Sequence, residues 1–190
     1  MRDWKSALDR LEQGNERFRN DAPEHRFRDS ARRQQLAEGQ SPFAAVLTCA
    51  DSRVVPELAF DAGLGELFVV SVAGNIATPG TIASLEYAVD QLRVPLVVVL
   101  GHESCGAVAA ALQGVTLSPH LDRLTGLIAP AIAACSSDDP DDVARENVRV
   151  AVAAIQEGSP IIGEATRVGE ARIIGAFYEL VSGRVLFNVA

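Results

Sequence analysis

The sequence predicts an α/β fold: a single domain with a mostly parallel central sheet flanked by helices, an antiparallel strand at its C-terminal edge and a helical arm at its N-terminus. After Gln40, short apolar segments that end at glycine or polar residues alternate with segments of helical spacing. The 190 residues are 48% apolar, which suits one domain with a substantial core. We expect residues 1–40 to form the arm and residues 41–190 the α/β core.

The arm begins with an amphipathic helix. Apolar side chains recur at spacings of three, four and seven residues from Trp4 to Phe18, with charged residues between them. A helix is therefore expected over residues 3–19, with its apolar stripe docked on another surface. The arginine-rich segment 20–33 lacks this periodicity, so we interpret it as a solvated arm that becomes helical only near 31–38.

Five segments are predicted as strands, and the first three are almost continuously apolar, as strands buried on both faces are. In chain order they are Ala44–Thr48, Leu67–Val72, Leu96–Leu100, Ile173–Phe177 and Val185–Val189. Helices are expected at 81–92, 104–112 and 143–157, the last after an acidic capping loop. The short connection 181–183 predicts a hairpin, which makes the last strand antiparallel.

Charge and hydropathy exclude several classes of protein. The net charge is −8, and residues 41–190 carry 17 acidic against 8 basic residues, which argues against nucleic acid or an anionic membrane as a partner. The longest strongly apolar run, 94–100, is far shorter than the roughly 20 residues that span a bilayer. The first residues show no signal-peptide pattern. We therefore expect a soluble, cytoplasmic protein.

Three cysteines and three histidines are the scarce reactive residues. Cys49 directly follows the first predicted strand, and His102 and Cys105 follow the third. Ligands gather at the carboxyl ends of parallel strands, so these three side chains could meet there. Zn²⁺ accepts thiolate and imidazole, and three protein ligands leave a fourth position open, which favours a catalytic over a closed structural site. If His102 and Cys105 begin a helix, their spacing places them on one face.

A plainer interpretation competes for each residue taken singly. Cys49 and Cys105 could be small buried hydrophobic side chains at strand ends, and this is our interpretation of Cys135. His25 and His120 lie in polar segments and are expected at the surface. The combination of the first two cysteines with a histidine at a neighbouring strand end is what favours a metal.

Asp51 and Arg53 lie beside the first cysteine. Arg53 is the only basic residue between Arg33 and Arg93. In an extended segment, Cys49, Asp51 and Arg53 point the same way. A carboxylate paired with a guanidinium stays ionised and oriented, so it could accept a hydrogen bond from a zinc-bound water. A structural salt bridge in a loop is the competing interpretation.

Two motifs carry a family resemblance. They are Cys49-x-Asp51-x-Arg53 and Gly101-His102-x-x-Cys105-Gly106. Five further segments match: Gln13–Phe18, Gly65–Val70, Ala73–Asn75, Ser84–Val89 and Gly175–Leu180. Together they are similar to the β-class carbonic anhydrase family, and the likeness covers nearly the whole chain.

The resemblance implies a zinc enzyme that reversibly hydrates carbon dioxide to bicarbonate and a proton, by attack of zinc-bound hydroxide. It implies Zn²⁺ ligation by Cys49, His102 and Cys105, with Asp51 and Arg53 orienting the fourth ligand. In some members the residue matching Asp51 leaves its arginine and binds zinc itself.

The resemblance also implies a substrate pocket and an oligomer. The implied substrate-binding residues are Gln40, Phe68, Ala73, Tyr87 and Gly106. Among them, Gln40 would offer its amide to the substrate, Phe68 and Ala73 would line an apolar pocket, and Tyr87 would come from a neighbouring subunit. The implied assembly is a homodimer or higher homo-oligomer in which the N-terminal helix lies across the partner.

One subgroup of the family has a regulatory bicarbonate pocket built from a tryptophan, an arginine and a tyrosine. The matching positions here are Val46, Ser71 and Tyr178. Two of the three residues are therefore replaced, and we expect this regulation to be absent.

Two other functions remain open from the sequence. The same zinc site could hydrolyse carbonyl sulfide or carbon disulfide, since these are also small linear molecules. A zinc-binding module without turnover is the second alternative. Asp51, Arg53 and Gln40 argue against the module, because a purely structural zinc site needs none of them.

Overall fold

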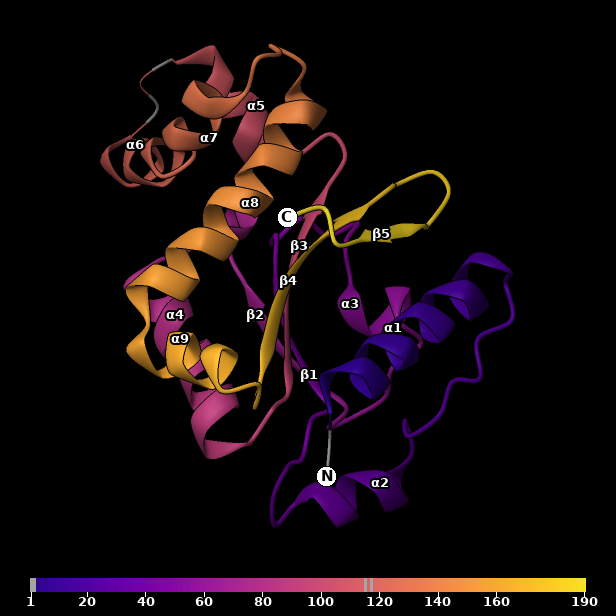
Figure 1. Ribbon diagram of the computed structural model, residues 1–190. Helices are drawn as coiled ribbons and strands as arrows, with labels where there is room; N and C mark the ends of the chain where they lie inside the picture. The colour runs from indigo at the N-terminus through magenta and orange to yellow at the C-terminus, as the bar shows by residue number, and fades with distance from the viewer. Residues whose placement is uncertain (1–2, 115, 117) are drawn as a thin grey trace.

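The computed structural model describes residues 3–114, 116 and 118–190. Its architecture is a five-stranded sheet with helices packed on both faces (Figure 1). The strands are β1 (Ala44–Thr48), β2 (Leu67–Ser71), β3 (Leu96–His102), β4 (Arg172–Tyr178) and β5 (Val185–Phe187). Across the sheet they run in the order β2-β1-β3-β4-β5, and only β4 and β5 pair antiparallel. The predicted fold class is confirmed.

The predicted helices are all present, and the structure adds four short ones. The α-helices are α1 (Trp4–Arg19), α2 (Ser30–Leu36), α3 (Pro56–Ala59), α4 (Pro79–Glu86), α5 (Gly106–Gln113), α6 (Pro119–Gly126), α7 (Ala129–Ala134), α8 (Pro140–Gly158) and α9 (Pro160–Arg167). A 3₁₀ turn, η1 (Ala73–Asn75), follows β2, and a π turn, η2 (Tyr87–Gln91), continues α4. The four unpredicted helices, α3, α6, α7 and α9, span four to eight residues and begin with proline in the first turn. They are too short for apolar periodicity to show.

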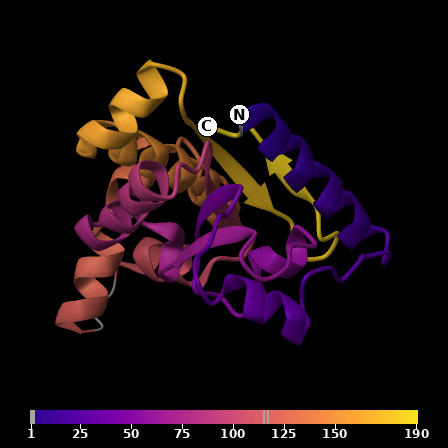
Figure 2. The same ribbon diagram turned by 90° about the horizontal axis from the view of Figure 1, so that it is seen from below.

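The core lies on both sides of the central strands. Every residue of β1 and β3 is buried. Because successive side chains of a strand point to opposite faces, one set packs with α8 and α9 and the other with α1. Figure 2 shows α1 on one side of the sheet and α9 on the other. In the described part of the chain, no helix has both the length and the apolar character needed to cross a membrane.

The edge strand β2 differs from the expectation of burial on both faces. Leu67, Phe68, Val69 and Val70 are only half-buried, and Ser71 is exposed. The reason is position: β2 pairs with β1 along one side, and no strand of the described residues lies along the other. Apolar composition alone does not distinguish a central strand from an edge strand.

The apolar stripe of α1 packs against this chain itself. Ala7 and Leu11 are buried in the cluster that contains the inner residues of β1 and β3. Gly14 lies so close to α3 that an added Cβ would be 1.9 Å from the carbonyl oxygen of Phe60. Asn15 donates to the carbonyl oxygens of Ala59 and Gly183 at 3.0 and 2.8 Å. The middle of the stripe is therefore covered by this chain, while Trp4, Leu8 and Phe18 are half-buried.

Helix α8 approaches the sheet closely because two glycines face it. An added Cβ on Gly101 would lie 2.5 Å from Cγ2 of Val148, and one on Gly175 would lie 2.6 Å from its Cγ1. Val148 thus occupies the space that side chains at these two positions would fill. This contact sets how near α8 lies to the end of β3.

A buried carboxylate ties the segment after α1 to the core. The side chain of Asp61 is fully buried and accepts hydrogen bonds from Nε of Arg17 at 2.7 Å and from the backbone N–H groups of Glu24 and His25 at 2.9 and 3.2 Å. Burial raises the pKa of Asp61, but the hydrogen bond from Arg17 and those from the two N–H groups outweigh it and lower the pKa below 3.8. The arm is therefore held by a charged anchor.

We expect Asp61→Asn to lower the free energy of unfolding by about 2–3 kcal/mol, because it weakens bonds to three donors and removes the nearer of the two carboxylates that pair with Arg17. Urea unfolding followed by circular dichroism measures this loss. The lowered pKa means that the carboxylate stabilises the fold above pH 3.8 and that this contribution is lost as the pH falls through the folded-state value. The difference between variant and wild type should therefore shrink in acid.

Glu164→Gln is the matched control, because Glu164 pairs with Arg167 on the exposed face of α9. It should leave the unfolding curve unchanged. An Asp61→Asn protein as stable as the wild type at neutral pH would show that the anchor contributes nothing.

Candidate metal centre

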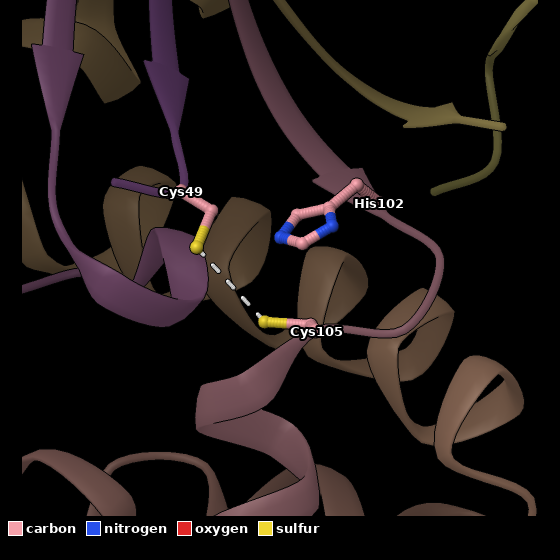
Figure 3. Close-up of side chains that lie close together, drawn as sticks. All are labelled: Cys49, His102 and Cys105. Carbon is pink, nitrogen blue, oxygen red and sulfur yellow. Dashed lines mark hydrogen bonds between the residues drawn. The ribbon is translucent and has the colours of Figure 1, made fainter. Parts of the chain in front are cut away.

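Three elements bring Cys49, His102 and Cys105 together (Figure 3). Cys49 directly follows β1, and His102 is the last residue of β3, the strand that pairs with β1 in parallel. Cys105 immediately precedes α5. One ligand atom from each side chain lies within 4.8 Å of the others, and all three residues are buried. The juxtaposition that the strand ends predict is therefore present.

The short connection between His102 and Cys105 is a turn, not the first turn of a helix as the spacing suggested. His102 belongs to β3, and Ser104 adopts a left-handed conformation with φ of 52° before α5 begins at Gly106. Asp141, in the first turn of α8, accepts a hydrogen bond from the backbone N–H of Ser104 at 2.7 Å. The two candidate ligands lie close together because the chain reverses direction between them. The predicted proximity is confirmed, but the helical geometry from which it was predicted is wrong.

The donor set and its spacing fit zinc. The two sulfur atoms lie 4.0 Å apart, close to the roughly 3.8 Å that two Zn–S bonds of about 2.3 Å subtend at a tetrahedral ion. Nδ1 of His102 lies 2.8 Å from the carbonyl oxygen of Glu103, so it carries the proton and donates. Nε2 then holds a lone pair, and it is buried without a hydrogen-bond partner in the described part of the chain. A metal ion would satisfy it.

The three side chains also shift one another's protonation. The pKa of Cys49 is lowered, chiefly by a hydrogen bond from Cys105, and further by the nearby imidazole of His102 and the backbone N–H of Gly74. The neighbouring sulfur of Cys49 and burial raise the pKa of Cys105. Burial lowers the pKa of His102, but the neighbouring sulfur of Cys49, the carbonyl oxygen of Glu103 and the charge of Asp51 together outweigh burial and raise it. The site thus stabilises a thiolate on Cys49 before any metal binds.

Asp51 and Arg53 form an ion pair next to the cluster. Oδ2 of Asp51 accepts from Nη2 of Arg53 at 2.7 Å, and Oδ1 accepts from its Nε at 2.9 Å and from its backbone N–H at 2.9 Å. The hydrogen bonds from Arg53 hold the pKa of Asp51 far below its usual range. The segment turns here, so the expected extended alternation is wrong and the pair forms within a tight loop.

Arg53 also joins the two loops that carry the cluster. Its Nη2 donates to the carbonyl oxygen of Ser104 at 3.2 Å. One guanidinium therefore contacts the loop after Cys49 and the loop between His102 and Cys105. This hydrogen bond fixes the two loops relative to each other. The spacing of residues in the sequence does not predict it.

The five residues implied for substrate binding fall into two groups. Ala73 lies next to Gly74, whose N–H donates to Cys49, and Gly106 follows Cys105. An added Cβ on Gly106 would meet no atom within 4 Å, so the space beside it is open.

The other three lie towards the starts of β1 and β2, the ends opposite to the one that carries the cluster. Gln40 is exposed and precedes β1, and Phe68 pairs with Ala45 near the start of β1. Cys49 is four residues further along, or about 13 Å at the usual strand rise. The ring of Tyr87 lies 6.2 Å from that of Phe68, so these two belong together.

The remaining cysteine and histidines lie apart from the cluster. Cys135 is half-buried rather than buried, and His25 and His120 are exposed.

The three positions of the family's regulatory pocket are built differently here. Val46 and Tyr178 are buried in the apolar cluster beneath α1, and Ser71 is exposed, with its hydroxyl donating to the carbonyl oxygen of Cys49 at 3.4 Å. Position 71 therefore offers no arginine side chain to bind an anion, in line with the expectation that the regulatory bicarbonate pocket is absent.

Sequence reasoning missed Gly74 and Asn147. The N–H of Gly74 donates to Sγ of Cys49 at 3.2 Å, and Nδ2 of Asn147 donates to the carbonyl oxygen of Gly74 at 2.8 Å. A signal for Asn147 existed: it is an uncharged polar residue among the apolar positions that face the sheet along α8. A buried polar side chain of this kind predicts a buried hydrogen-bond partner.

Comparison with known proteins agrees with this geometry. The family model "Carbonic anhydrase" matches residues 44–185. Carbonic anhydrase 2 of Mycobacterium tuberculosis is 39% identical over 192 residues, covering 97% of this chain and 91% of that protein. The carbonic anhydrase of Mycolicibacterium smegmatis is 38% identical, covering 96% and 90%.

Solved structures agree as well. A tetrameric β-carbonic anhydrase of Sordaria macrospora superposes with a TM-score of 0.74 at 27% identity, covering 81% of this chain and 84% of that one. A β-carbonic anhydrase of Coccomyxa, in complex with acetazolamide, gives 0.72 at 28% identity, covering 81% and 75%. Fold and site define an α/β protein with a Cys-His-Cys cluster at the carboxyl edge of a parallel sheet. This chain belongs to the β-carbonic anhydrase family.

We expect the purified protein to carry about one zinc ion per chain and Cys49→Ser to carry little, because the variant loses one of three ligands. Mass-spectrometric metal analysis measures the content. Cys135→Ser, which changes the cysteine outside the cluster, should keep the wild-type content. Zinc retained in full by Cys49→Ser would place the metal elsewhere.

Proposed function

We propose that this protein is a zinc-dependent carbonic anhydrase that reversibly hydrates carbon dioxide to bicarbonate and a proton. The observation that carries the proposal is the buried Cys49, His102 and Cys105 cluster, which offers three ligands among the residues that the structure describes, beside an ionised carboxylate. Family membership supports the same reaction. A structural zinc site has no use for the Asp51–Arg53 pair.

The residues divide the work as follows. Cys49, His102 and Cys105 would hold a zinc ion, and its Lewis acidity would lower the pKa of a water molecule, less strongly than at a three-histidine site because two thiolates would offset its charge. Asp51 stays ionised and could accept a hydrogen bond from the water molecule that the ion would activate, which would orient that water. Arg53 keeps this carboxylate from turning to the metal. Regeneration requires a proton to leave to solvent.

The substrate pocket needs a second copy of the chain. Ala73 and Gly106 supply the side nearest the cluster, whereas Gln40, Phe68 and Tyr87 lie too far from the cluster of their own chain. Tyr87 is 50% exposed, and the apolar side chains of the edge strand β2 are only half-buried. A homodimer or higher homo-oligomer in which β2 and Tyr87 of one copy face the metal cluster of another would complete the pocket. One structurally similar protein is described as tetrameric.

Two further expectations complete the proposal. A cytoplasmic location suits two free cysteines 4.0 Å apart, which an oxidising compartment would endanger. The division into an arm, residues 1–40, and a core, residues 41–190, suits an arm anchored at Asp61. The anion regulation that needs an arginine at position 71 is proposed to be absent.

Stopped-flow measurement of carbon dioxide hydration tests the function. We expect activity that rises towards alkaline pH, because two thiolate ligands offset the charge of the metal. Cys49→Ser should abolish it, and Cys135→Ser should not. Activity that survives loss of Cys49, or a rate that is flat from acid to alkaline pH, contradicts the proposal. If the protein hydrolyses carbonyl sulfide but does not hydrate carbon dioxide, the proposed substrate is wrong and the proposed metal site stands.

Arg53→Ala should lower kcat/KM on the order of 10–100-fold with the zinc content unchanged, because Asp51 loses the partner that holds it away from the metal. Arg53→Lys should fall between, since an ammonium group cannot make the two parallel bonds. Arg149→Ala is the matched control, because Arg149 is equally exposed and pairs with Glu146 on α8. Wild-type activity in Arg53→Ala would remove the pair from the mechanism.

A further inference from the structure

We propose that Asn147 is a positioning residue for the metal-binding sulfur of Cys49, and that it acts through the backbone of Gly74. The inference rests on the metal site of the proposed function, but it does not depend on which reaction the metal serves. Two hydrogen bonds carry it. Nδ2 of Asn147 donates to the carbonyl oxygen of Gly74 at 2.8 Å, and the N–H of Gly74 donates to Sγ of Cys49 at 3.2 Å.

The turn at Gly74 has an unusual backbone that other contacts must hold. Gly74 has φ of 76°, and the next residue, Asn75, has φ of 43°. Two successive left-handed residues are unfavourable unless the surroundings fix them, above all when the second is not glycine. An added Cβ on Gly74 would lie 3.1 Å from Ile128 and 3.2 Å from Ala107, so the space admits only glycine comfortably. The conformation aims the N–H at the sulfur.

Asn147 holds the other side of that residue. The carbonyl group of Gly74 belongs to the peptide after it, and its N–H to the peptide before it. When Asn147 fixes the carbonyl group, the left-handed conformation of Gly74 determines where the N–H points. Loss of the amide frees this turn to rotate, and the bond to Cys49 is the first one affected.

The position of Asn147 is itself fixed. It is 2% exposed and lies on α8, next to Val148, which fits against Gly101 and Gly175. The buried face of α8 is otherwise made of small and branched apolar residues. An apolar side chain would suit packing at this position better, so the amide is there for its hydrogen bond.

The chemistry of the bond suits a metal ligand. A hydrogen bond from an N–H group to a thiolate stabilises its negative charge and orients the sulfur, which affects how strongly it donates to a metal. A contact of this kind should therefore be visible in metal affinity and in the electronic spectrum of the bound ion. Both quantities can be measured without any catalytic turnover.

The test compares Asn147→Leu with Asn15→Leu. Asn15 is a matched control because it is also a buried asparagine, 4% exposed, but its bonds go to Ala59, Gly183 and Val185, away from the metal site. Both variants should unfold at lower urea. Only Asn147→Leu should bind zinc more weakly, on the order of 10–100-fold in a chelator competition.

Cobalt(II) supplies the spectroscopic reading. We expect the thiolate-to-cobalt charge-transfer band to shift in Asn147→Leu and to stay in place in Asn15→Leu. Asn147→Ser, whose hydroxyl is too short to reach Gly74, carries the same expectation and serves if the leucine variant does not fold. Wild-type affinity and an unshifted band in a folded Asn147 variant overturn the proposal. A wild-type protein that binds no metal instead refutes the proposed function.

Discussion

The structure depends on one constraint: two thiols and an imidazole are buried within 4.8 Å of one another. Such a group is unfavourable without a cation, because one sulfur carries charge and Nε2 of His102 is left without a partner. The parallel pairing of β1 and β3 makes the cluster possible, since it ends both strands at one edge of the sheet. The turn at Ser104 then returns Cys105 to it.

The surrounding elements hold the loops that carry these ligands. Arg53 contacts both loops, while α8 contacts the loop between His102 and Cys105 through Asp141 and the η1 turn, whose Gly74 bonds Cys49, through Asn147. The closeness of α8 follows from Gly101 and Gly175, which leave room for Val148. On the other side, β2 is an edge strand and Tyr87 is half exposed, and this is the surface at which the proposed second copy would pack.

Much of this could be predicted from sequence, for identifiable reasons. Continuous apolar segments predict the buried strands, and rare reactive residues at strand ends, such as Cys49 and His102, indicate the site. The rest depends on contacts that no local pattern encodes. The edge position of β2, the reversal at Ser104 and the bond from Asn147 to Gly74 arise from packing between segments far apart in the chain. The extended geometry expected at Asp51 failed because its own side chain bonds the backbone of Arg53.

The central claim is an open zinc site with two sulfur ligands and one imidazole. X-ray absorption at the zinc edge of the loaded protein tests it most directly. The account predicts two sulfur atoms at about 2.3 Å, one imidazole nitrogen at about 2.0–2.1 Å and a light atom in the remaining position. Three or four sulfur neighbours, or fewer than two, would contradict it.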